Sequence, residues 1–222
     1  MMKRLAAKRT PCLLLSLCVL YGAAAIPASA EIVSEFTTDR DGWWVYTLNH
    51  KPLANPPEIV STRVPSWNPA GYIETDDIDS FATFFSAPAK FKGDQSAAFG
   101  TTFSYEMLLV GSEEPAIIDI LFVGAGRTLI GDQDTSALKD SNWHTFDITL
   151  VGSSFLLNAV DGPQATDEDV QAVLADLQKL YILADHTSFN EHTQLDNVIM
   201  RPVPEPSAIL LALLAGGLAC AM

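Results

Sequence analysis

Apolar and polar residues alternate with a period of two along much of the chain. The clearest stretch covers residues 99–110. Its alternate positions are Phe99, Thr101, Phe103, Tyr105, Met107 and Leu109. A period of two places these side chains on one face of an extended strand. Residues 143–150 alternate in the same way, and residues 42–48 are rich in aromatic and β-branched side chains, which favour strands.

Shorter apolar segments separated by turn residues predict further strands. These segments are residues 71–74, 117–123, 127–130, 153–158, 180–184 and 194–201. Residues 81–91 contain Pro88, which predicts an edge strand or a strand with a proline-marked corner. Residues 49–67 contain four prolines, which predict a long irregular loop with at most one short strand.

One segment has the helical period instead. Val170, Val173, Leu174 and Leu177 recur at i, i+3, i+4 and i+7, which is typical of an amphipathic helix packed along one stripe. Thr166 is placed to cap its N-terminus. Many strands with a single short helix predict an all-β fold, an antiparallel two-sheet β-sandwich.

The two ends of the chain have the patterns of processing signals. Residues 1–30 combine four basic residues, an apolar run and small residues before Glu31, which predicts a signal peptide cleaved after Ala30. Residues 202–222 begin with three prolines in five residues and continue as an uncharged apolar tail. Residues 31–201 are left as one domain by length.

Charge and cysteine content exclude several classes of function. Residues 31–201 contain nine basic and 26 acidic residues, a net charge near −17. That charge repels nucleic acid and anionic membranes. The three cysteines, Cys12, Cys18 and Cys220, lie in the terminal segments, so the domain has no disulfide, thiol nucleophile or cysteine metal site.

The other candidate chemistry is unspecific, and we predict no catalytic residues. The four histidines show neither zinc-site nor catalytic-triad spacing. Residues 124–126 predict a glycine hairpin. The acidic loops at residues 39–42, 76–79 and 131–134 are typical of turns, and no carboxylate pair suited to glycoside hydrolysis stands out.

Several ordered segments resemble the laminin B (domain IV) family. They are residues 67–73, 84–94, 99–105, 121–126, 143–146 and 195–198. The resemblance implies a jelly-roll sandwich, similar to carbohydrate-binding modules, that acts in an extracellular matrix without catalysis. It also implies that a structural calcium is held between the N-terminal segment and the last strand, by Glu35 and Asp196 with backbone help near Gly42.

The C-terminal tail resembles the PEP-CTERM sorting signal of bacterial exported proteins. The resemblance rests on Pro204, Glu205 and Pro206, followed by the apolar segment. It implies recognition by an exosortase-type transpeptidase and delivery to the cell envelope or an extracellular polysaccharide layer. The tail departs from the pattern because it lacks the terminal arginine cluster.

We therefore expect a non-enzymatic, exported surface or matrix module that binds a glycan, an extracellular polysaccharide or a matrix protein. It would contact the membrane only transiently, through its terminal segments. Trp44 and Trp67 are the predicted stacking platforms, whereas Trp43 and Trp143 are expected in the core. A secreted polysaccharide-active hydrolase and a structural envelope protein without a small ligand stay open as alternatives.

Overall fold

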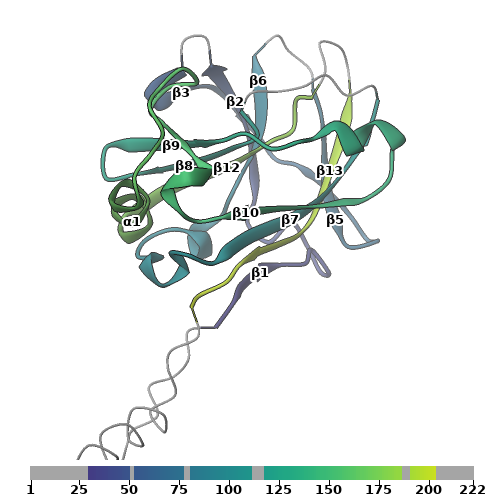
Figure 1. Ribbon diagram of the computed structural model, residues 1–222. Helices are drawn as coiled ribbons and strands as arrows, with labels where there is room; N and C mark the ends of the chain where they lie inside the picture. The colour runs from purple at the N-terminus through teal and green to yellow at the C-terminus, as the bar shows by residue number, and fades with distance from the viewer. Residues whose placement is uncertain (1–29, 51–52, 78–80, 112–117, 187–190, 204–222) are drawn as a thin grey trace, which may run out of the picture. The chain divides into compact units, whose positions relative to one another are not determined.

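The strands of this computed structural model form two sheets in which every pair of neighbours is antiparallel (Figure 1). The structure describes residues 30–50, 53–77, 81–111, 118–186 and 191–203. Sheet A contains β1 (Ile32–Ser34), β4 (Ser66–Asn68), β5 (Tyr72–Asp76), β7 (Thr102–Val110), β10 (His144–Thr149) and β13 (His192–Met200). Sheet B contains β2 (Trp44–His50), β3 (Leu53–Arg63), β6 (Ala82–Ser86), β8 (Ile120–Gly124), β9 (Arg127–Gly131), β11 (Leu156–Leu157) and β12 (Leu177–Leu183). The predicted two-sheet antiparallel sandwich is confirmed.

The order of strands in sheet A is β10-β7-β13-β5-β4, and in sheet B it is β11-β9-β8-β12-β6-β2-β3. In sheet A, β5 and β1 share one edge of β13: β5 pairs with residues 192–195 and β1 with residues 198–200. The first and last described strands are therefore neighbours. This arrangement brings the segment after β1 close to the middle of β13.

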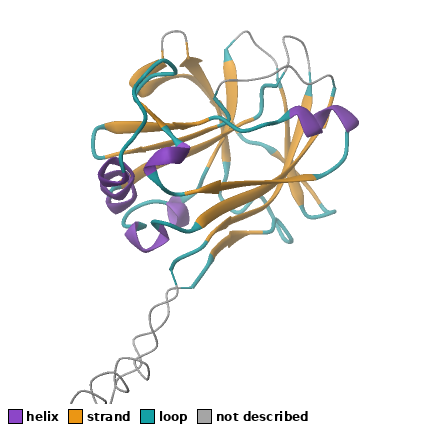
Figure 2. Cartoon of the chain, viewed as in Figure 1, coloured by secondary structure: helices purple, strands orange, loops and turns teal. Residues whose placement is uncertain are grey.

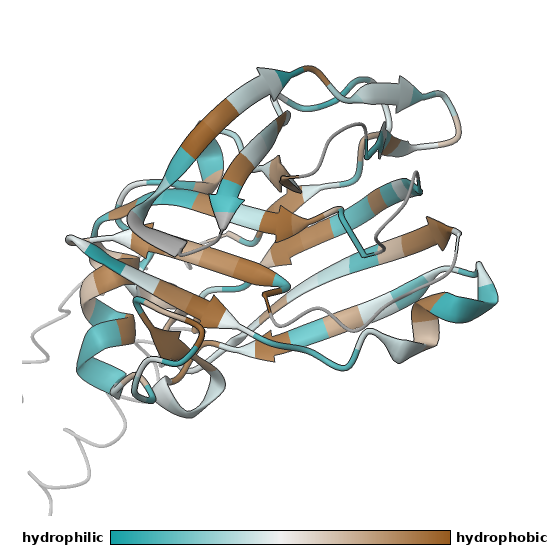
Figure 3. Ribbon diagram, turned by 90° about the horizontal axis from the view of Figure 1, so that it is seen from above, coloured by the Kyte–Doolittle hydropathy of each residue, from teal (hydrophilic) through white to brown (hydrophobic). Residues whose placement is uncertain are grey.

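The main core lies between the two sheets. Alternate residues of β7, namely Phe103, Tyr105, Met107 and Leu109, are buried there. Figure 3 shows such apolar segments distributed along the strands. Each fully buried side chain of this size stabilises the fold by about 1.5–3 kcal/mol. The predicted alternation over residues 99–110 is thus confirmed, although the strand itself begins at Thr102.

Trp43 anchors the start of β2 in this core, as predicted. Its side chain is fully buried, and its Nε1 donates a hydrogen bond to Ser34 Oγ at 2.9 Å. The indole makes edge contacts with Phe36 and Phe91, with ring centroids 6.0 and 5.7 Å apart. The hydrogen bond ties β1 to the chain entering β2, so one side chain links the two sheets.

Sheet B also has a buried outer surface. A second apolar cluster contains Leu48, Phe84, Leu121, Ile130 and Tyr181, from five different strands of sheet B. The edge strand β3 contacts β9, which lies five positions away in the strand order. Sheet B must therefore curl, and the curl encloses its own outer face.

That curl explains why two strands of sheet B are buried along their whole length. β6 and β8 are buried at every position because they lie between neighbours and carry apolar side chains on both faces. Of the two alternatives predicted for residues 81–91, the edge strand is wrong, because β6 pairs with both β12 and β2, whereas the strand that ends before a proline-marked corner agrees with the structure. Its proline, Pro88, lies beyond the end of the strand and removes no ladder hydrogen bond.

The helix α1 (Asp167–Ala175) is the one α-helix among the described residues, and the 3₁₀-helices are drawn in the same purple in Figure 2. Thr166 and Asp169 form a capping box, in which the Asp169 amide donates to Thr166 Oγ1 at 3.2 Å and the Thr166 amide donates to Asp169 at 2.9 Å. Val170, Val173 and Leu174 are buried as predicted. The last residue of the predicted stripe, Leu177, instead begins β12.

Four 3₁₀-helices complete the described secondary structure. They are η1 (Ala89–Phe91), η2 (Ser96–Ala98), η3 (Ser136–Asp140) and η4 (Gly152–Ser154). The predicted glycine hairpin is confirmed: Gly124 pairs with Arg127 across a two-residue turn in which Ala125 and Gly126 both have positive φ. No helix in the described ranges is both long and apolar enough to cross a membrane.

The prediction for residues 49–67 was wrong. Instead of an irregular loop, this segment contains the 11-residue strand β3 and, after a two-residue gap, β4. Pro56 and Pro57 fall where the register between β2 and β3 shifts, between the pairs Asn49↔Glu58 and His50↔Leu53. At that irregularity the missing proline N–H groups cost no regular ladder bond.

Candidate functional site

The outer face of sheet A carries the polar side chains that the alternation excludes from the core. On β7, Ser104 and Glu106 lie between core residues and so point away from the core. The strand register aligns Thr145, Glu106 and Asp196 in one row and Asp147, Ser104 and Ile199 in the next. We call this surface, on β10, β7, β13 and β5, the A face.

Three carboxylates meet on the A face. Asp196 lies directly opposite Glu106 in the ladder. Burial, together with the negative charges of Glu106 and Glu35, raises the pKa of Asp196 to about 6, against the lowering effect of the hydrogen bond from the Asn197 amide. That amide donates to Asp196 Oδ1 at 2.7 Å, and Asn197 Nδ2 donates to Glu106 Oε2 at 2.9 Å. The site thus holds more negative charge than its surroundings compensate.

A backbone irregularity in β13 creates this geometry. The register with β7 shifts between Asp196 and Ile199, and Asn197 has a φ of 46°. Asparagine tolerates this left-handed conformation better than most residues do. The bulge places both the amide and the side chain of Asn197 where they bind two neighbouring carboxylates.

The structure brings together the two carboxylates predicted to hold calcium, because Glu35 lies near enough to Asp196 to raise its pKa. At Gly42, the third predicted position, an added Cβ would lie 3.2 Å from the side chain of Pro88. Glu106, which sequence reasoning did not select, is the third carboxylate of the group. Calcium binding by Glu35 and Asp196 stays a prediction.

A groove of about 720 Å³ runs along the A face next to these carboxylates. Its lining includes the acids Glu31, Glu106 and Asp147, the hydroxyl residues Thr101, Thr102, Ser104 and Thr145, and the amide of Asn197. Arg201 is the one basic residue in the lining. It forms an ion pair with Glu31 at 3.1 Å and donates to Ser104 Oγ at 3.0 Å.

An aromatic pair lies on the same face. The rings of Tyr72 and Trp143 contact each other edge to face, with centroids 5.6 Å apart. Tyr72 comes from β5, and Trp143 immediately precedes β10. The prediction that Trp143 lies in the core was wrong, because 38% of this residue is exposed. It shares its strand parity with Thr145, which is exposed, and not with the buried Phe146.

The two tryptophans predicted as platforms lie elsewhere. Trp44, on β2 of sheet B, is 41% exposed, and the guanidinium of Arg40 lies 5.9 Å from its ring centroid. Trp67, on β4, is 37% exposed, and its Nε1 donates to the carbonyl oxygen of Phe36 at 2.7 Å. Trp67 therefore also fixes the chain after β1.

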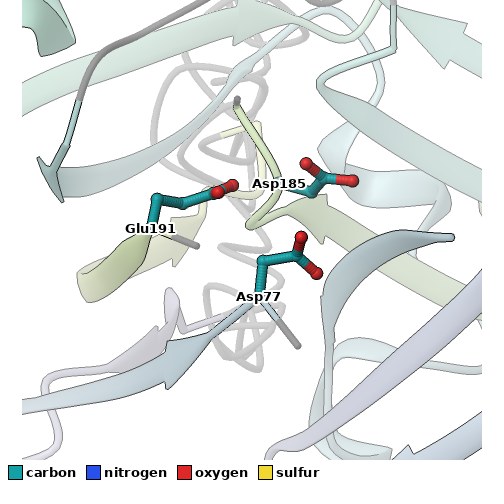
Figure 4. Close-up of side chains that lie close together, drawn as sticks. All are labelled: Asp77, Asp185 and Glu191. Carbon is teal, nitrogen blue, oxygen red and sulfur yellow. The ribbon is translucent and has the colours of Figure 1, made fainter. Parts of the chain in front are cut away.

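A second group of carboxylates converges at the ends of three strands (Figure 4). Asp77, Asp185 and Glu191 each offer an oxygen, and these oxygens all lie within 4.8 Å of one another. Two further contacts hold the group: Thr83 Oγ1 donates to Asp77 Oδ1 at 3.0 Å, and the amide of His186 donates to Glu191 Oε1 at 2.7 Å. Oxygen ligands at such spacing are of the type that hard cations prefer.

Sequence reasoning did not find this second group. It assigned Asp77 to a polar turn and did not select Asp185 or Glu191. The end of β5 and the start of β13 are adjacent only because the strands pair, with the Asp77 amide donating to the carbonyl oxygen of Glu191 at 3.1 Å. The predicted sorting residues Pro204, Glu205 and Pro206 lie outside the described residues.

Comparisons with known proteins agree on the fold. The L4b domain of human laminin alpha-2 superposes with a TM-score of 0.62 at 13% sequence identity, covering 79% of this chain and 98% of that domain. No curated protein matches the sequence. The family model of Laminin B (Domain IV) matches residues 84–207, more than half of the chain. The chain therefore belongs to the laminin B (domain IV) family.

Proposed function

We propose that this protein is a non-enzymatic, exported adhesion module that holds extracellular polysaccharide on the A face. The observation that carries the proposal is the combination of a groove lined by hydroxyl, amide and carboxylate groups with an aromatic pair on the same face, in which Trp143 is 38% exposed and Tyr72 is half-buried. Sugar hydroxyls need many polar partners, and the apolar face of a sugar ring stacks on flat aromatic side chains. Membership of the laminin B family supports a role in an extracellular matrix.

The chain supplies a matched pair of tryptophans to test this. Trp143 on the A face and Trp44 on sheet B are 38% and 41% exposed. We expect Trp143→Ala to weaken retention on immobilised extracellular polysaccharide about three- to ten-fold, as the loss of one aromatic contact predicts. Trp44→Ala should bind like the wild-type chain. The reverse result would move the site to sheet B, and no retention of the wild-type chain on any polysaccharide would remove glycan binding from the proposal.

A polysaccharide-active hydrolase is the alternative that one observation favours. Asp196, with a pKa raised to about 6, stands opposite Glu106, and a carboxyl group with a raised pKa next to a second carboxyl group is what a general acid in glycoside hydrolysis requires. However, both side chains project from neighbouring strands of one open face, so they approach a ligand from the same side. We therefore expect no release of reducing ends from polysaccharide. Release that Glu106→Gln abolishes would establish the alternative.

Calcium binding at Glu35 and Asp196 is a separate proposal. The crowding of these carboxylates with Glu106 supports it, because a cation would relieve their mutual repulsion. We expect calcium to raise the melting temperature of the wild-type chain and to have a smaller effect on Glu35→Gln. An unchanged melting temperature in saturating calcium would contradict it. An increase that persists in Glu35→Gln but is lost in Asp185→Asn would indicate the second group instead.

We also propose that the tail is a sorting signal recognised by an exosortase-type transpeptidase. The support is the Pro-Glu-Pro sequence at residues 204–206, followed by an uncharged apolar segment. In cells that carry such an enzyme, the wild-type chain should lose its tail and reach the envelope surface or the medium. Glu205→Ala should accumulate with its tail intact. Identical processing of the two chains would count against this signal.

A further inference from the structure

The lining of the groove on the A face contains more acidic than basic side chains. Three carboxylates line it, against the single guanidinium of Arg201. Arg201 is already engaged by Glu31, so Glu106 and Asp147 have no ion-pair partner among the described residues. Beyond the groove, Glu35 and Asp196 extend the same negative field towards Tyr72. Such a surface repels polyanions and attracts cationic groups.

The two uncompensated acids are close enough to act on one ligand. Asp147 lies opposite Ser104, and Glu106 is two residues further along β7. Residues on this diagonal are separated by about 7–8 Å between their Cα atoms. The exposed Thr145 lies opposite Glu106 and next to Asp147 in strand parity, so a hydroxyl group flanks both carboxylates, whereas Ser104 is only 4% exposed. A ligand that carries both hydroxyl and ammonium groups matches this pattern.

The architecture favours a sugar polymer over a basic peptide. Peptides bind sheets mostly through main-chain hydrogen bonds at a free edge. The floor of this groove is β7, whose backbone is already paired with β10 on one side and β13 on the other. Only side chains are therefore presented to a ligand on β7. The Tyr72–Trp143 pair adds a surface for the apolar face of a sugar ring.

We infer that the A-face groove selects polysaccharides that contain free amino sugars over neutral or uronic-acid polymers. This inference rests on the proposed glycan binding and specifies its ligand class. Glu106 and Asp147 bind the ammonium groups, the threonine hydroxyls bind the sugar hydroxyls, and the aromatic pair packs against a ring. A hydrogen bond between an ammonium group and a carboxylate at a partly desolvated site strengthens binding more than a neutral hydrogen bond does.

The test compares four soluble probes by titration calorimetry at one ionic strength. They are a glucosamine oligosaccharide, its fully N-acetylated counterpart, an oligogalacturonate and an oligolysine peptide. At a pH of about 6, where the amine is largely protonated, we expect the glucosamine oligosaccharide to bind about ten-fold more tightly than the acetylated one, equivalent to about 1.4 kcal/mol. We expect the oligogalacturonate not to bind.

Charge-neutral variants locate the effect. Glu106→Gln and Asp147→Asn keep the size of each side chain, and glutamine retains an oxygen for the hydrogen bond from Asn197. Each variant should reduce the preference for the free amine about three-fold or more, whereas Asp161→Asn, in an exposed loop after β11, should leave it unchanged. Melting curves identify any variant that fails to fold, and the other variant then carries the test.

The outcomes separate this inference from the proposal on which it rests. Equal binding of the free and acetylated oligosaccharides, or tighter binding of the oligogalacturonate, overturns the amino-sugar preference but leaves glycan binding intact. Oligolysine that binds as tightly as glucosamine, with the same sensitivity to Glu106→Gln, overturns the inference in favour of a basic peptide. Binding of no oligosaccharide, together with no retention on polysaccharide, overturns both.

Discussion

Asp196 offers the sharpest test of the electrostatics of the A face. In the folded chain its pKa is raised from its ordinary value of 3.8 to about 6, by burial and by the charges of Glu106 and Glu35. The folded state therefore binds a proton more tightly than the unfolded state does. Stability falls as the pH rises from about 4 to about 6, and above that range the full penalty of the charged carboxylate remains.

The size of the effect follows from the pKa. A change from 3.8 to about 6 corresponds to at most ~3 kcal/mol at about 1.4 kcal/mol for each pH unit. The side chain keeps some contact with water, and solvent screening reduces this to about 1 kcal/mol. Asp196→Asn removes the charge, and the side-chain oxygen of asparagine can still accept the hydrogen bond from the Asn197 amide. We therefore expect the variant to be about 1 kcal/mol more stable than the wild-type chain at neutral pH.

The assay is urea unfolding of both chains in the presence of a chelator, at a pH of about 7.5 and again at about 4. At the lower pH most of the difference should disappear, because Asp196 of the folded wild-type chain is then protonated. Asp147→Asn, an exposed acid on the same sheet, is the matched control and should change stability little at either pH. If Asp196→Asn is less stable than the wild-type chain at neutral pH, or if its effect is the same at both, the reasoning on this cluster is refuted.

Three further predictions concern the fold and are checked by the same urea unfolding. Trp43→Phe should destabilise the chain by about 2 kcal/mol, because it leaves a cavity and removes a hydrogen bond. Trp44→Phe should change the stability by less than about 0.5 kcal/mol, because Trp44 is exposed. Equal effects of the two substitutions would contradict the assigned burial. Thr166→Ala should cost about 1 kcal/mol by removing the helix cap, and an unchanged midpoint would count against the capping box. Gly124→Ala should cost about 1–3 kcal/mol, because its Cβ would lie 2.3 Å from the carbonyl oxygen of Asp176; a neutral result would show that the chain after α1 shifts freely.

Strand periodicity predicted most of the fold. Where the period of two was unbroken, as in residues 99–110 and 143–150, the sequence identified β7 and β10 and their buried faces. β3 escaped detection because its prolines dominate the local pattern, and only the shifted register with β2 shows that they cost no regular hydrogen bond. For β6 the sequence left an edge strand and a proline-marked corner open, because a proline near a strand does not reveal whether the strand pairs on both sides.

The candidate site was harder to predict from the sequence than the fold, because it depends on which strands are neighbours. Glu35 and Asp196 were selected through the family resemblance, and Glu106 joins them only because β7 pairs with β13. The exposure of Trp143 could have been predicted from the alternation, because this residue has the same parity as the exposed Thr145 and not as the buried Phe146. The general preference of tryptophan for the core outweighed that signal in our prediction.

The central claim is that the A face of this laminin-type sandwich holds polysaccharide. Nuclear magnetic resonance mapping of backbone amides during titration with the glucosamine oligosaccharide and its acetylated counterpart tests it most directly. We predict shifts concentrated in β7, β10 and the second half of β13, together with the indole signal of Trp143, and little change in β2, β6 and β12. Shifts confined to sheet B, or an unchanged spectrum with both saccharides at saturating concentration, would contradict the claim.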